Sequence, residues 1–171
     1  NHISHKVPGV EFSTGSLGHG LPFGIGKAKV AKKLNQKWQT YVLLSDGELQ
    51  EGSNWEAFMF AAHHCLDNLT AIIDYNNLQS LTSVDKTLNI MPLDKKLVSF
   101  GWHVIEVDGH DHDALKKSFK EARTIKGRPT VIIAKTIKGK GVSYMENRVE
   151  WHYKYPSEDE LRVAMAELEN A

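Results

Sequence analysis

The chain has 171 residues, of which 41% are hydrophobic and 25% are charged, and its formal net charge at pH 7 is +0. Such a length and composition indicate one soluble globular domain with a core of ordinary size. The balanced charge excludes an electrostatic case for binding nucleic acid or a membrane surface. No apolar run approaches the roughly 18 residues that span a bilayer.

The chain begins at Asn1 rather than at methionine and contains a single cysteine, Cys65. We therefore expect one domain over residues 1–171 that lacks an N-terminal portion, as a fragment or a processed product. We expect no signal peptide, and one cysteine argues against a disulfide framework. A cytoplasmic location is predicted on these grounds.

A glycine-rich run from Gly15 to Gly20 overlaps the start of the first predicted helix, which covers residues 17–34. Apolar residues of this helix alternate with lysines at helical spacing, as in an amphipathic surface helix. Glycines at the start of a helix allow a ligand to approach the backbone closely. Their spacing is not that of the dinucleotide-binding fingerprint, so the run alone predicts only a tight turn.

Four apolar, β-prone runs predict strands at residues 41–44, 69–73, 102–107 and 130–134. Helices are predicted at residues 54–65, at 93–100, from Asp111 or Asp113 to about 124, and after a cap at Ser157. The alternation predicts an α/β fold: a doubly wound, mostly parallel sheet with right-handed crossovers and helices on both faces. Helix capping explains the acids around His110 better than a metal site does.

Polar residues end the first two of these strands, because Asp46 and Gly47 follow the first and Asn76 follows the second. The carboxyl ends of neighbouring parallel strands share one sheet edge, so Asp46 and Asn76 are expected to face one crevice. A carboxylate, an amide oxygen and nearby carbonyls suit Mg²⁺ or Ca²⁺, and Gly47 opens backbone N–H groups to anionic oxygens. Each dipeptide alone is a common turn; together they predict a site for a metal-bound phosphate or diphosphate.

Residues 46–57, DGELQEGSNWEA, with Asn76 about thirty residues beyond, resemble the thiamine diphosphate motif of the transketolase family. The resemblance implies thiamine diphosphate and Mg²⁺ (or Ca²⁺) as cofactors, with the metal held by the side chains of Asp46 and Asn76 and the carbonyl of Leu78. Gly47 and its neighbour Glu48 would supply N–H groups to the diphosphate. Ser80, Leu81 and Thr82 replace the family's usual residues beside the thiazolium ring.

Residues 8–20, PGVEFSTGSLGHG, are similar to the transketolase segment that contacts the aminopyrimidine ring. The resemblance assigns Gly15, Ser16 and Leu17 to cofactor binding. His2 falls on a family histidine that touches the hydroxyls of the donor substrate, which implies a catalytic role.

Residues 135–152 resemble the end of the diphosphate-binding domain in split transketolases. A histidine follows tryptophan there and contacts diphosphate and substrate, so His152 is assigned to both cofactor binding and catalysis. Tyr153 replaces the family's glycine and Tyr155 a small residue, and this bulk would either narrow the mouth of the site or move the loop.

The resemblance implies that the chain is the diphosphate-binding half of a transketolase in carbohydrate metabolism, with the pentose phosphate pathway as the expected setting. Such an enzyme transfers a two-carbon ketol unit from a ketose phosphate to an aldose phosphate. The family's cofactor-activating glutamate belongs to a separate pyrimidine-binding domain, so activity would need a pyrimidine-binding partner subunit in an α2β2 hetero-oligomer. Glu51 and Glu56 match carboxylates at the subunit interface, although acids near a helix start also favour the helix dipole.

Alternatives remain at this stage. Another thiamine diphosphate enzyme, such as a 2-oxo acid dehydrogenase or deoxyxylulose phosphate synthase, shares the metal motif. A non-catalytic binding or assembly subunit would keep the fold. A Mg²⁺-dependent phosphatase is least favoured, because no second carboxylate is placed to act as nucleophile or base.

Overall fold

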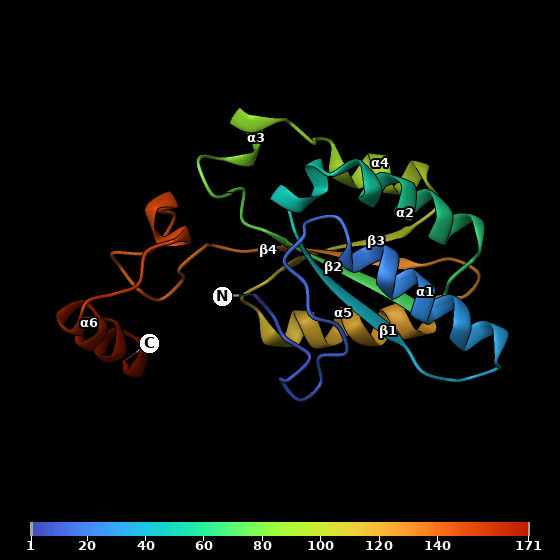
Figure 1. Ribbon diagram of the computed structural model, residues 1–171, viewed down its shortest axis with the longest axis horizontal. Helices are drawn as coiled ribbons and strands as arrows, with labels where there is room; N and C mark the ends of the chain where they lie inside the picture. The colour runs from blue at the N-terminus through green and yellow to red at the C-terminus, as the bar shows by residue number, and fades with distance from the viewer. Residues whose placement is uncertain (1, 171) are drawn as a thin grey trace.

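The structure is a computed structural model that describes residues 2–170. Its centre is a parallel sheet of four strands in the order β1-β2-β4-β3 (Figure 1). The strands are β1 (Thr40–Ser45), β2 (Leu69–Tyr75), β3 (His103–Asp108) and β4 (Thr130–Lys135). All three neighbouring pairs are parallel, so all four carboxyl ends lie at one edge, as the alternation of elements predicts.

Helices cover both faces of this sheet. Figure 1 shows α1 (Gly20–Lys33), α2 (Gly52–His63) and α4 (Leu93–Ser99) on one face and α5 (His112–Thr124) on the other. The chain crosses the sheet in one direction from β1 to β3 and returns from β3 to β4. Right-handed crossovers therefore place α5 opposite α2 and α4, and the predicted doubly wound α/β fold is confirmed.

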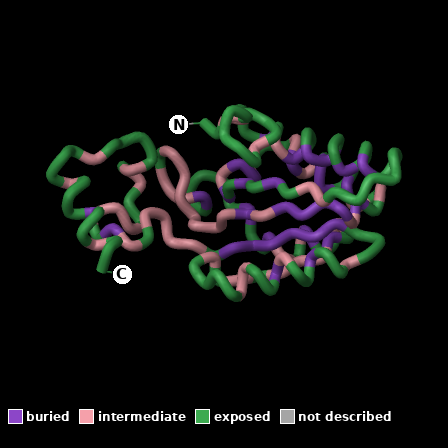
Figure 2. Tube along the Cα trace, turned by 90° about the horizontal axis from the view of Figure 1, so that it is seen from below, coloured by how far each residue is buried: buried purple, intermediate pink, exposed green. Residues whose placement is uncertain are grey.

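The core lies mainly between the sheet and the helices α1, α2 and α4. The central strand β4 is buried over its first five residues, as the purple trace of Figure 2 shows. Phe58 of α2 and Trp102 are among the largest fully buried side chains. The Trp102 indole Nε1–H donates to the Phe58 carbonyl at 2.9 Å, so this aromatic pair fixes α2 against the start of β3.

Helix α1 approaches β1 closely because of a glycine. A Cβ placed on Gly24 would overlap Cγ2 of Val42. The backbone of α1 at Gly24 therefore packs directly on the Val42 side chain of β1. The close contact positions the loop that precedes α1 relative to the end of β1.

Several boundaries differ from the sequence-based expectation. Helix α1 begins at Gly20 rather than at residue 17, because Gly18 has φ +81 and turns the chain. A 3-10 helix η1 (Gly47–Gln50) precedes α2, and a short helix α3 (Val84–Thr87) follows β2. The predicted cap of α5 is Asp111, whose Oδ1 accepts the N–H groups of Asp113 and Ala114.

The C-terminal part of the chain extends away from the sheet, in orange and red in Figure 1. It contains the 3-10 helix η2 (Val149–His152) and the helix α6 (Glu158–Glu169). The predicted cap Ser157 forms a full capping box with Glu160. Across residues 2–170, no helix has the length and apolar character needed to cross a membrane.

Candidate functional site

The two predicted metal-ligand segments meet at the carboxyl edge of the sheet. Ser45 of β1 is in register with Asp74 of β2, and the Asp46 N–H continues this pairing to the Asp74 carbonyl at 3.3 Å. Asn76 directly follows β2. The structure therefore brings Asp46 and Asn76 to the same edge on neighbouring strands.

The carboxylate of Asp46 is buried and joins the two strand ends. Its Oδ1 accepts the Gly47 N–H at 2.7 Å, and its Oδ2 accepts the Asn77 N–H at 2.5 Å. Burial raises the pKa of Asp46 above its ordinary value, the charge of Asp74 acts in the same direction, and the two N–H bonds oppose this shift. Within residues 2–170, no lysine, arginine or histidine forms an ion pair with Asp46. A divalent cation would supply the missing charge.

The turn after β2 carries the other two predicted metal ligands. The side-chain oxygen of Asn76 accepts the Leu78 N–H at 2.9 Å, and Leu78 forms an antiparallel bridge with Ser83. Across residues 2–170, no cluster of three or more His, Cys, Asp or Glu side chains could hold a metal ion. One carboxylate, one amide oxygen and one carbonyl fit a hard cation that keeps several waters, as Mg²⁺ does.

Gly47 lies under the side chain of Gln79. A Cβ at Gly47 would be 3.0 Å from Oε1 and 3.1 Å from Cβ of Gln79. The two N–H groups predicted to bind diphosphate donate within the turn, from Gly47 to Asp46 Oδ1 and from Glu48 to Ser45 Oγ. A diphosphate contact through Gly47 and Glu48 stays a prediction.

The side chain of Glu48 has a role that the sequence did not indicate. It is 9% exposed, and its Oε1 accepts the Gly18 N–H at 2.9 Å. Its Oε2 accepts the Ser45 N–H at 3.4 Å, while Ser53 Oγ donates to the Gly18 carbonyl at 2.8 Å. Gly18, at the end of the predicted aminopyrimidine loop, is thus bonded directly to η1 and α2, and through the Glu48 side chain to the end of β1.

The structure brings His2 to the predicted aminopyrimidine loop. A Cβ at Gly15 would lie 2.8 Å from Cγ and Nδ1 of the His2 ring, so the ring packs on the bare Gly15 backbone. Ser16 and Leu17, which follow, are exposed. His2 therefore lies beside a loop that is open to a ligand.

His152 is placed differently. It ends η2 in the C-terminal segment, is exposed, and stacks edge-on with Tyr153 at a centroid distance of 4.9 Å. Although the residue is exposed, its ring loses some hydration to the surrounding chain, which lowers the pKa of His152, and the positive charge of Lys138 adds to this. Among residues 2–170, the structure does not bring His152 into hydrogen-bond contact with another predicted site residue. Tyr155, predicted to narrow the site, is 85% exposed.

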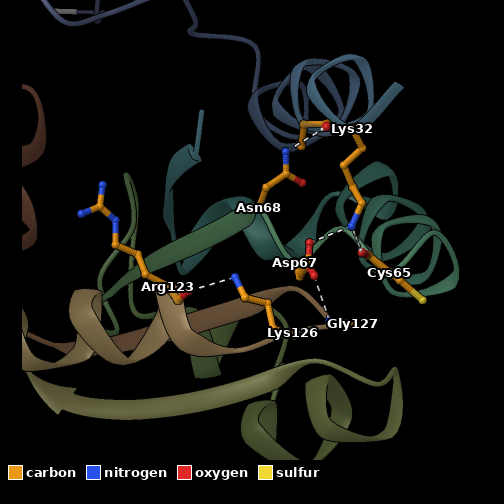
Figure 3. Close-up of polar contacts among 8 residues, drawn as sticks. Lys32, Cys65, Asp67, Asn68, Arg123, Lys126 and Gly127 are labelled. Atoms are coloured by element: carbon orange, nitrogen blue, oxygen red, sulfur yellow. Dashed lines mark hydrogen bonds and ion pairs between the residues drawn. The ribbon is translucent and has the colours of Figure 1, made fainter. Parts of the chain in front are cut away.

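A separate polar cluster lies at the opposite edge of the sheet, where the strands begin (Figure 3). Lys32 Nζ donates to Asp67 Oδ1 at 2.7 Å and to the Cys65 carbonyl at 2.9 Å, and the Gly127 N–H donates to Asp67 Oδ2 at 2.9 Å. An open hollow of about 360 Å³ lies beside Lys32 and Asp67. The cluster joins the chain segments that enter β1, β2 and β4, so this edge stabilises the fold.

Comparison with known proteins agrees with the geometry. Residues 2–169 match the family model described as transketolase, thiamine diphosphate binding domain. A subunit of the apulose-4-phosphate transketolase of Actinobacillus succinogenes is 47% identical over 98% of this chain. The 6-deoxy-6-sulfo-D-fructose transketolase subunit SqwG of a Clostridium species is 37% identical over 96%. The chain spans 60% of the length of each relative.

Solved structures give the same result at the level of the fold. Transketolase from Campylobacter jejuni superposes with a TM-score of 0.89 at 32% sequence identity, over 94% of this chain and 26% of that one. The likeness in fold and the match to the family model lead to the same family. The chain therefore belongs to the transketolase family, as a thiamine diphosphate-binding domain.

Proposed function

We propose that this chain is the diphosphate-binding half of a two-subunit transketolase. It would transfer a two-carbon ketol unit from a ketose phosphate to an aldose phosphate. The observation that carries the proposal is the junction of two strand ends through Asp46 and Asn77, in a chain that belongs to this family. Neither alternative thiamine enzyme class is favoured, since the relatives described above are named transketolases.

The metal is part of the proposal. The side chains of Asp46 and Asn76 and the carbonyl of Leu78 would hold Mg²⁺ (or Ca²⁺), and the ion would in turn hold the diphosphate. The fit rests on a buried carboxylate whose pKa is raised by burial and which has no cationic partner among residues 2–170. Oxygen ligands alone match the preference of these ions.

Thiamine diphosphate, when bound, supplies the carbanion chemistry that breaks the bond between C2 and C3 of the ketose. The residues of this chain bind and orient. Gly15, Ser16 and Leu17 would line the aminopyrimidine ring, and Gly47 and Glu48 would face the diphosphate. His2 and His152 would orient the substrate and stabilise charge that develops on its oxygen atoms. The packing of His2 on Gly15 supports its part of this assignment.

A partner subunit is the second part of the proposal. The relatives from Actinobacillus succinogenes and Phocaeicola vulgatus are each named as one subunit of a transketolase. We propose that this chain likewise requires a pyrimidine-binding subunit, which would supply the cofactor-activating glutamate. We further propose an α2β2 assembly in the cytoplasm. Glu51 and Glu56 on the exposed face near the start of α2 are candidates for the subunit interface.

The substrate is proposed from the names of the relatives. Two of them are named for apulose 4-phosphate and one for 6-deoxy-6-sulfo-D-fructose. We propose a sugar with a terminal anionic group, and we rank apulose 4-phosphate ahead of pentose phosphate pathway sugars. The greater identity to the apulose enzyme from Actinobacillus succinogenes supports this order.

The experiment combines the chain with a candidate pyrimidine-binding subunit, Mg²⁺, thiamine diphosphate, a ketose donor and an aldose acceptor. Turnover is expected only when both proteins are present. Turnover by this chain alone would refute the requirement for a partner. A pair that decarboxylates 2-oxo acids but transfers no ketol unit would refute the transketolase assignment.

A further inference from the structure

We propose that Glu48 is a positioning residue, which locks the predicted aminopyrimidine loop to the strand end that would hold the metal. The inference rests on the proposed function and deepens it. It gives the Glu48 side chain a role through other residues, distinct from the direct diphosphate contact that the family resemblance implies for its backbone.

The carboxylate of Glu48 connects two segments that are about thirty residues apart in the sequence. Its Oε1 accepts the Gly18 N–H at 2.9 Å, and its Oε2 accepts the Ser45 N–H at 3.4 Å. Its own N–H donates to Ser45 Oγ at 3.1 Å. The residue that precedes Asp46 and the glycine that follows the loop are therefore held by one buried side chain.

Gly18 is held from both sides of its backbone. Ser53 Oγ donates to its carbonyl at 2.8 Å while Glu48 accepts its N–H. Gly18 has φ +81, and a Cβ there would overlap Ser53 Oγ and lie 2.8 Å from Glu51 Cβ. The N–H and the carbonyl of Gly18 are both hydrogen-bonded, and the position has no room for a side chain. These contacts hold the end of the loop in place.

The base of this connection is itself fixed. Glu48 belongs to η1, whose carbonyls accept bonds from α2: Asn54 Nδ2 donates to the Glu48 carbonyl at 2.7 Å, and Trp55 Nε1 donates to the Leu49 carbonyl at 2.8 Å. Among residues 2–170, Glu48 forms no ion pair with a lysine, arginine or histidine. Both oxygens of the Glu48 carboxylate therefore accept hydrogen bonds from backbone N–H groups. Hydrogen bonds to a charged acceptor are stronger than neutral ones, so they hold these backbone segments firmly.

Loss of the Glu48 side chain should affect the two halves of the cofactor site differently. The bonds of Asp46 go to Gly47 and Asn77 and do not involve the Glu48 side chain. Removal of that side chain releases the loop that begins at Gly15 and leaves the strand-end contacts of Asp46 in place. Affinity for the pyrimidine-bearing cofactor should therefore fall by more than affinity for the metal–diphosphate part alone.

The test is calorimetry on the complex of this chain with a pyrimidine-binding subunit, using two ligands, Mg²⁺–thiamine diphosphate and Mg²⁺–pyrophosphate. Glu48→Ala is expected to weaken binding of the first by about tenfold or more, as for a lost hydrogen bond to a charged group. Binding of the second should weaken by clearly less than binding of the first. Glu48→Gln keeps an acceptor for the Gly18 N–H and should recover most of the lost affinity. Ser53→Ala should also weaken the first ligand more than the second, by a smaller factor than Glu48→Ala.

Glu167→Ala is the matched control. The Glu167 carboxylate accepts the N–H and O–H of Ser143 in the C-terminal segment, so its loss should change neither affinity. Equal weakening of both ligands by Glu48→Ala, or no weakening of either, would overturn the positioning role. A wild-type complex that binds neither ligand would overturn the proposed function and this inference together. If Glu48→Ala does not fold, Ser53→Ala decides by the same comparison.

Discussion

The Asp46 carboxylate accepts a hydrogen bond from the backbone N–H of Asn77, a residue 31 positions further along the chain. This bond crosses from the end of β1 to the turn after β2, and the register of the two strands makes it possible. A single buried carboxylate thereby defines the distance between the two segments proposed to bind metal. The following predictions test what each contact contributes.

Asp46→Asn should separate binding from folding. The amide keeps one acceptor and much of the shape, so the melting temperature should change by only a few degrees. Affinity for Mg²⁺–thiamine diphosphate should fall by about 100-fold or more, because a charged metal ligand is lost. Asp108→Asn is the matched control, since Asp108 ends β3 at the same edge and accepts the His110 N–H at 2.9 Å. Equal binding by Asp46→Asn and wild type would contradict the metal assignment.

Metal binding should depend on pH through Asp46. Burial raises its pKa above the ordinary value of 3.8. A proton on Asp46 therefore stabilises the metal-free fold below pH 3.8, and this contribution is lost as the pH rises through the raised pKa. Mg²⁺ competes with that proton, so affinity should increase over the same window, with proton release. Calorimetry in buffers of different ionisation enthalpy measures the release, and Asp46→Asn should abolish it. A pH-independent affinity would argue against Asp46 as a ligand.

Gly47→Ala should force Gln79 to move. The added Cβ would lie 3.0 Å from Oε1 of Gln79, which predicts a loss of about 1 kcal/mol in the free energy of unfolding. The double variant with Gln79→Ala removes the contact with Oε1 but keeps the Cβ of residue 79 at 3.1 Å. The two changes should therefore be partly non-additive in urea unfolding. Gly26→Ala, in α1 with no atom within 4 Å of the added Cβ, is the control and should be neutral or stabilising. Additive losses would show that the contact with Gln79 has no effect.

His2→Ala should affect the use of substrate more than the binding of cofactor. In the complex with a pyrimidine-binding subunit, we expect kcat/KM for the ketose donor to fall by about 10- to 100-fold. Affinity for thiamine diphosphate should fall by less, because the His2 ring packs on one predicted cofactor residue, Gly15, and the predicted metal ligands are elsewhere. His112→Ala, an exposed histidine at the start of α5, serves as the control. Equal rates for His2→Ala and wild type would remove His2 from the site.

Much of the fold could be predicted because its signals are local. The four apolar runs became the four strands, and Asp111 and Ser157 cap helices through bonds to residues two or three positions away. The predicted start of α1 was three residues too early. The helical spacing of apolar residues extends back past Gly18, but the positive φ of Gly18 keeps the helix from beginning before Gly20. Helix α3 has only four residues, which is too short for a periodic pattern.

Part of the candidate site could also be predicted from the sequence, and part could not. Asp46 and Asn76 could be paired in advance because strand ends of a parallel sheet share one edge. The bond from Gly18 to Glu48 and the packing of Gln79 on Gly47 depend on the tertiary fold. No spacing rule connects those residues, so only the structure shows them.

The central claim is that the ends of β1 and β2 bind one divalent ion between them. Crystals of the chain with Mn²⁺ and thiamine diphosphate would locate the ion by anomalous scattering. We predict one peak within coordination distance of Asp46 Oδ, Asn76 Oδ1 and the Leu78 carbonyl, with the diphosphate on its open side. An ion bound elsewhere, or cofactor bound with no ion between these two strand ends, would contradict the account.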